Sequence, residues 1–140
     1  MIWCLISNDF EASRHEDTFK YLTIYFDNAN TGMNTEKYLA MCLALGDEPD
    51  PNKIPPDYNS FPPYVHTGID IFNSLPDTYS GGMSPVYAGK NFSSLTALFD
   101  IFQVDSRSER MQVFEVIRFL DTRARKQAIR EAEKAAKKSR

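Results

Sequence analysis

Residues 106–140, SRSERMQVFEVIRFLDTRARKQAIREAEKAAKKSR, contain neither proline nor glycine. Ser106 and Glu109 have the capping-box spacing, in which a hydroxyl and a carboxylate satisfy backbone N–H groups at the start of a helix. The segment therefore predicts one long C-terminal helix that begins at Asp105 or Ser106. Such a helix would be about 50 Å long, whereas a domain of this size has a radius of gyration of about 14 Å. It must extend beyond its own domain or bend back.

The two halves of this segment differ in composition. In residues 111–120, MQVFEVIRFL, apolar side chains occupy nearly the whole circumference of the predicted helix. A helix with one face in water does not need this pattern, so this half is expected to be the centre of the core, or half core and half interface. After Leu120 the apolar stripe continues mainly as alanine, with Ile129 the one sizeable apolar residue. Alanine buries little area, so we expect the final residues to dock only weakly on their own body.

Charge is distributed unevenly along the chain. Residues 1–120 carry eight Lys/Arg and sixteen Asp/Glu, a net charge of −8, and residues 121–140 carry eight Lys/Arg and three Asp/Glu, a net charge of +5. This asymmetry predicts attraction between the basic tail and an acidic body, either its own, that of a neighbouring copy or that of another partner. The candidate partner-binding residues are Arg123, Arg125, Lys126, Arg130, Lys134, Lys137, Lys138 and Arg140.

Two other interpretations of the tail remain open. It can be a solvated helix in which the Asp121/Arg125 and Glu133/Lys137 pairs each add a few tenths of a kcal/mol. It can also bind nucleic acid. That alternative ranks lower because no aromatic side chain lies among the basic residues for base stacking, and an acidic body would repel phosphates.

Local signals predict further helices upstream. Asn34 is a suitable N-cap and Gly46 a suitable C-terminal stop for a helix over 35–45, and Pro62 and Pro63 can form the first turn of another that ends before Pro76. A third helix is expected to start at residue 93 or 94 and to end near residue 104.

The segments between these helices give weaker signals. Residues 47–63 hold six prolines, which predicts an extended connector. Near the N-terminus, Ser13 and Glu16 have the spacing of a helix start. Residues 1–7 and 20–26 can be strands or helices, so a small β element near the N-terminus is possible. A further short strand is possible at 85–88, within a Gly/Ser/Pro loop.

Composition limits the class of protein. The chain is 42% hydrophobic and 25% charged, as in ordinary globular proteins. Its longest apolar stretches are far shorter than the roughly 20 residues that span a bilayer, and the first stretch lacks the basic flank of a signal peptide. Cys4 and Cys42 show no metal or redox spacing and are expected to be free buried thiols. We therefore predict a cytoplasmic protein, or one in a virion or the host cytoplasm if it is viral, without a membrane partner.

No catalytic or metal-binding motif is found. Residues 84–91 resemble a P-loop only superficially, because Ser84 and Asn91 stand where a glycine and a Ser or Thr are required; residues 89–91 are expected to form a turn into the next helix. His15 and His66 lie far apart, with no metal ligands at suitable spacing. The sequence thus predicts no enzyme activity, no cofactor, no metal and no catalytic residue. A small enzyme of unknown chemistry is the weakest alternative.

Together these patterns predict a mainly α fold. It is a single-domain helical bundle of five or six helices, with a proline-rich strap and a long projecting C-terminal helix. Its expected organisation is an acidic globular domain at 1–120, including the connector 47–63, followed by a basic helical extension at 121–140. The expected function is a protein-interaction or assembly role, through a protein partner or self-association. The aromatic, Asn- and Asp-rich composition with a basic Ala/Lys ending resembles in style small bacteriophage virion, tail or assembly proteins, without a diagnostic motif.

Overall fold

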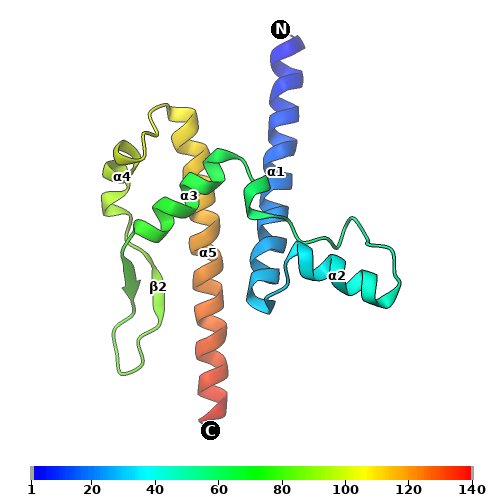
Figure 1. Cartoon of the computed structure of the whole chain (residues 1–140). Helices are drawn as coiled ribbons and strands as arrows, with labels where there is room; N and C mark the ends of the chain where they lie inside the picture. The colour runs from blue at the N-terminus through cyan, green and yellow to red at the C-terminus, as the bar shows by residue number, and fades with distance from the viewer. Residues whose placement is uncertain (1, 140) are drawn as a thin grey trace. The chain divides into compact units, whose positions relative to one another are not determined.

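The structure is a computed structural model that describes the backbone of residues 2–139 and the side chains of residues 16–139. Within that range the protein is mainly helical, with five α-helices and one two-stranded antiparallel sheet (Figure 1). Its contacts divide the chain into two compact units, Met1–Phe61 and Pro62–Arg140. The organisation expected from the sequence, a globular domain at 1–120 followed by a basic extension at 121–140, stays a prediction.

The first unit contains two α-helices. Helix α1 spans Ile2–Thr31 and α2 spans Thr35–Leu45. The ambiguous segment 20–26 is therefore helical, and so are residues 2–7 of the other ambiguous segment. The possible β element near the N-terminus is not formed in these residues. The helix start expected at Ser13 is also wrong, because α1 continues through it. The apolar run before Ser13 extends the helix, so this capping-box spacing lies within a helix rather than at its end.

The caps of α2 confirm the sequence prediction. The Asn34 side chain accepts a hydrogen bond from the Lys37 N–H at 2.8 Å. Gly46 ends the helix with φ of 72°, in the left-handed region that favours glycine. Cys42 is buried and is a free thiol, as expected, while the side chain of Cys4 lies outside the described residues.

The proline-rich segment packs against the helices of its own unit. Thr35 donates its hydroxyl to the Pro55 carbonyl at 2.7 Å. The ring of Tyr25 on α1 lies 6.0 Å from that of Tyr58, in the 3-10 helix η1 (Tyr58–Ser60), and 5.7 Å from that of Phe61. These aromatic contacts fix the end of the connector on α1.

The second unit is built around α5 (Arg107–Lys138). Helix α3 (Pro63–Ser74) packs across it, followed by β1 (Asp77–Tyr79), β2 (Tyr87–Lys90), the 3-10 helix η2 (Phe92–Ser94) and α4 (Leu95–Ile101). Pro63 begins α3 and Ser106 caps α5, where its hydroxyl accepts from the Glu109 N–H at 3.2 Å, as predicted. The hairpin pairs Asp77 with Lys90 and Thr78 with Gly89. This sheet is the β element of the fold, and it lies between α3 and α4 in sequence.

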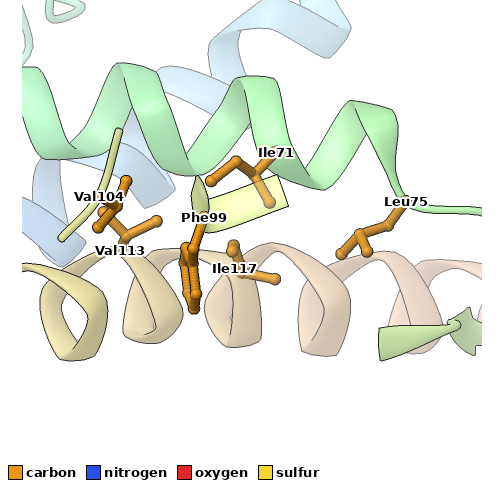
Figure 2. Packing of buried hydrophobic residues seen from close by; sticks show 6 residues of the cluster. All are labelled: Ile71, Leu75, Phe99, Val104, Val113 and Ile117. Carbon is orange, nitrogen blue, oxygen red and sulfur yellow. The ribbon is translucent and has the colours of Figure 1, made fainter. Parts of the chain in front are cut away.

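The core of this unit lies between α3 and α5. Figure 2 shows Ile71 of α3 and Leu75, which directly follows α3, facing Val113 and Ile117 of α5, with Phe99 of α4 beside them. Gly68 permits this close approach, because a Cβ at that position would lie 2.6 Å from Cγ1 of Val116. Each fully buried aliphatic side chain contributes about 1.5–3 kcal/mol. The first half of the C-terminal segment is thus a core helix.

Candidate functional site

The predicted basic tail begins inside the fold. Residues 121–138 continue α5 without interruption, and its last turns extend past the other elements of its unit (Figure 1). Asp121, the first residue of the tail, is only 5% exposed. Its carboxylate accepts hydrogen bonds from the Lys90 N–H at 2.8 Å and from the Tyr87 hydroxyl at 3.0 Å. The junction between hairpin and helix therefore includes the start of the tail.

Arg125 belongs to this junction as well. Its Nε lies 3.3 Å from the Asp121 carboxylate, one helical turn earlier. This is one of the two ion pairs that the sequence predicted within the tail. The other, Glu133 with Lys137, is not formed among the described side chains. Arg125 is thus partly neutralised by its own helix.

Gly89 allows β2 to approach the helix. Its φ of 116° lies in the region that L side chains rarely adopt. A Cβ at Gly89 would also lie 3.3 Å from Arg125 Cδ and 3.3 Å from an Asp121 carboxylate oxygen. The turn expected at residues 89–91 is therefore wrong for Gly89 and Lys90, which are strand residues, while Asn91 caps η2. The sequence pattern of a Gly-Lys pair could not reveal that the strand packs on a helix thirty residues away.

The Lys90 side chain joins the hairpin to α3. Its Nζ lies 2.6 Å from the Asp77 carboxylate and 3.1 Å from the Leu75 carbonyl oxygen, and 4.7 Å from the centroid of the Phe72 ring. An ammonium group over an aromatic ring is stabilised by the ring quadrupole. These three contacts satisfy the Lys90 ammonium group within the fold. Lys90 therefore has a structural role and is not available to bind a partner.

The Tyr87 hydroxyl is held as a hydrogen-bond donor. Burial raises the pKa of Tyr87, and the hydrogen bond to the Asp121 carboxylate raises it further. A phenolate beside a carboxylate would be repelled, so the neutral phenol is favoured. Tyr87, Lys90 and Asp121 form one polar network, which we call the junction network.

A shallow pocket borders the junction network. Its volume is about 230 Å³, below the roughly 300–1,000 Å³ of typical ligand sites. It is lined in part by Ala124 and Ala128, the first two residues of the predicted alanine stripe. Among residues 16–139, no three His, Cys, Asp or Glu side chains gather as metal ligands would. The pocket and network are therefore best explained as the packing of the hairpin on α5.

The last three turns of α5 have a different environment. Lys126, Arg130, Lys134, Lys137 and Lys138 are exposed and, within the described part of the chain, make no side-chain hydrogen bond or ion pair. Arg123 is half-buried, and Arg140 lies outside the described residues. The eight predicted partner-binding residues thus do not form one uniform site. We call the four of these exposed cations nearest the end of the helix, Arg130, Lys134, Lys137 and Lys138, the basic end.

A second concave surface lies at the opposite end of α5. An open groove of about 470 Å³ runs between α4 and α5. Its lining residues are Leu95, Phe99, Asp105, Arg107, Arg110, Met111 and Phe114. Met111 lies within the apolar run 111–120, and it is 52% exposed. The sequence raised a half-core, half-interface helix as one alternative for this run but did not indicate the concave surface beside it.

No described helix is both long and apolar enough to cross a membrane. The chain matches no protein-family model, no curated protein sequence and no solved structure.

Proposed function

We propose that the protein is a non-enzymatic interaction or assembly component whose basic end binds a neighbouring subunit or an acidic partner. The observation that carries the proposal is the contrast within one helix. Asp121 belongs to the junction network and Arg125 pairs with it, whereas the cations of the basic end are exposed without a partner among the described residues. Exposed cations attract an acidic surface and accelerate the association of the two proteins.

Composition gives the proposal a setting. The aromatic and Asn/Asp-rich body with an Ala/Lys ending is in the style of small bacteriophage virion, tail or assembly proteins. Such proteins work by binding copies of themselves or other structural proteins, which agrees with an exposed helix end of net positive charge. The proposal therefore includes a structural role in a bacteriophage particle or its assembly.

The test uses matched charge variants of the full-length chain. Lys134→Gln with Lys137→Gln removes two cations from the basic end, and Lys20→Gln with Lys53→Gln removes two exposed cations from the first unit. Binding of a fluorescent poly-glutamate peptide is measured by anisotropy at low and high salt. The first variant should weaken binding by about tenfold, with little effect of the second. Equal losses from both variants would refute a specific role of the basic end.

Nucleic acid is the second candidate, and one observation favours it. Residues 1–61 carry ten acidic and four basic residues, whereas residues 62–140 carry nine acidic and twelve basic ones. The net charge is therefore 4 − 10 = −6 in the first unit and 12 − 9 = +3 in the second, so the unit that carries the basic end does not itself repel phosphates. The same variants are tested with duplex DNA and single-stranded RNA at low salt. Binding that is stronger than to poly-glutamate, with a steep salt dependence, would favour this alternative.

A further inference from the structure

The apolar groove is the strongest candidate for an additional interaction site. Leu95 and Phe99 of α4 and Met111 and Phe114 of α5 supply its apolar lining. Met111 is 52% exposed although it stands in the most apolar run of the chain. Leu95 and Phe114 are half-buried and Phe99 is buried, so Met111 is the exposed member of an otherwise packed apolar lining. An exposed apolar side chain beside an apolar concavity can bind a partner there. This surface is separate from the basic end.

The groove is rigid on both sides. Arg110 donates from Nε to the Val104 carbonyl at 2.8 Å and from Nη2 to the Asp100 carboxylate at 2.9 Å, and its guanidinium lies 5.3 Å from the Phe99 ring centroid. The Phe114 ring meets the Phe92 ring edge-on at 6.3 Å. These contacts hold Arg110, Phe99 and Phe114 in place, so these three side chains lose little conformational entropy when a partner binds.

The rim of the groove carries both signs of charge. Asp105 and Arg107 line it, two residues apart, and both are exposed with no side-chain partner among the described residues. A uniformly acidic or uniformly basic partner would leave one of them beside a like charge. A two-fold contact joins the same patch on both copies, so Asp105 of each copy can meet Arg107 of the other. The rim is thus complementary to itself.

We propose that a second copy of this chain occupies the groove in a closed two-fold dimer. Met111 of each copy inserts against the apolar lining of the other groove, and two Asp105–Arg107 pairs form at the rim. The inference extends the proposed assembly role, but it uses the opposite end of α5. The basic end remains available to a further partner.

Two substitutions on α5 separate this dimer from non-specific association. Met111 and Ile129 are both 52% exposed, and Met111 alone lines the groove. Sedimentation velocity of the full chain at about 1–200 µM should show a monomer–dimer equilibrium. Met111→Glu should raise the dimer Kd at least about tenfold, because it buries an unpaired charge. Ile129→Glu should leave the Kd unchanged.

Charge exchange tests the two-fold geometry. Asp105→Arg and Arg107→Asp each place like charges opposite one another, and each should weaken the dimer by about tenfold. The double variant restores opposite signs and should restore the dimer. Circular dichroism and thermal unfolding establish that each variant is folded.

The outcomes distinguish this inference from the proposed function. A wild-type chain that stays monomeric throughout, or forms open higher oligomers, overturns the closed dimer. So does a dimer that Met111→Glu leaves intact. If removal of residues 133–140 abolishes association while Met111→Glu does not, the inference fails and the role of the basic end stands. If Met111→Glu abolishes the dimer while removal of residues 133–140 leaves poly-glutamate binding unchanged, the inference stands and the proposed role of the basic end fails.

Discussion

The carboxylate of Asp121 accepts a hydrogen bond from the backbone N–H of Lys90 at 2.8 Å, and so ties the hairpin to α5. Asp121 is the first residue after the apolar run, at the point where the sequence changes from core to basic tail. The change in composition is therefore not the point where packing ends. The hairpin extends the packed surface of α5 into the basic segment.

Replacement of Asp121 by Ala should destabilise the second unit by about 3 kcal/mol. The substitution leaves the Lys90 N–H and the Tyr87 hydroxyl without their acceptor, and an unsatisfied buried donor costs about 1–3 kcal/mol. Asp121→Asn keeps one acceptor oxygen and should destabilise the unit less.

Chemical denaturation of each variant gives its free energy of unfolding. Asp70→Asn, at an exposed site on α3, is the charge-matched control and should have almost no effect. Equal effects at both sites would exclude a special role of the junction network.

Gly68→Ala should destabilise the packing of α3 on α5 by about 1–3 kcal/mol. Alanine normally favours a helix over glycine, but the added methyl would lie 2.6 Å from Cγ1 of Val116. Overpacking of this kind forces the two helices apart. Thermal unfolding of Gly68→Ala, of Val116→Ala and of the double variant gives the coupling energy between the two positions.

The double variant should lose less stability than the sum of the two single variants, because Val116→Ala removes the atoms that clash. Gly81→Ala is the control, since a Cβ there meets nothing within 4 Å. A single Gly68→Ala variant as stable as the wild type would show that α3 and α5 can separate without cost, contrary to the close approach described here.

Local signals predicted the ends of helices better than the partners of helices. Asn34, Gly46, Pro63 and Ser106 act at their own helix ends through their own side chains or backbone angles, so their roles can be read from the neighbouring sequence. The hairpin depends on the distant partner Asp121, which no local pattern reveals. An acidic residue in line with the buried positions Ile117 and Leu120 was the available signal. It indicates a buried carboxylate that must find donors.

The packing of the connector was also beyond the local signals. The prolines predicted an extended connector over 47–63, and the contacts assign its residues up to Phe61 to the first unit. Phe61 belongs to the first unit through its contact with Tyr25, and the next residues begin α3. Composition does not tell on which side of such a connector its aromatic residues pack.

The second unit should lose stability in alkali through Tyr87. Its pKa is raised in the fold, chiefly by burial and then by Asp121, so above about pH 10 the unfolded chain loses the phenolic proton while the folded chain keeps it. The contribution of Tyr87 to the free energy of unfolding is therefore complete below pH 10. It falls as the pH rises beyond that value, by at most about 1.4 kcal/mol per pH unit. Denaturation at a series of pH values measures the slope.

Tyr87→Phe should reduce this slope and should cost about 1 kcal/mol at neutral pH, because the hydrogen bond to Asp121 is lost. Tyr79→Phe is the matched control, since Tyr79 lies on the paired strand and is 60% exposed. If the slope is the same in the wild type and in Tyr87→Phe, the alkaline loss comes from other groups.

Two truncations should separate the part of α5 that stabilises the fold from the part that is available to partners. Removal of residues 121–140 deletes Asp121 and Arg125, so the hairpin loses its contact with the helix and the unfolding midpoint should fall sharply. Removal of residues 133–140 keeps the junction network and deletes Lys134, Lys137 and Lys138, which are exposed. Because these residues bury little area, the unfolding midpoint should change by only a few degrees at most, about what 1 kcal/mol produces in a domain of this size.

Binding of poly-glutamate should nevertheless be lost in both truncated proteins. Thermal unfolding followed by circular dichroism, paired with the anisotropy assay, measures both properties on the same samples. A large fall in the midpoint after the shorter truncation would mean that the basic end is held by its own subunit, and the case for an external acidic partner would then fail.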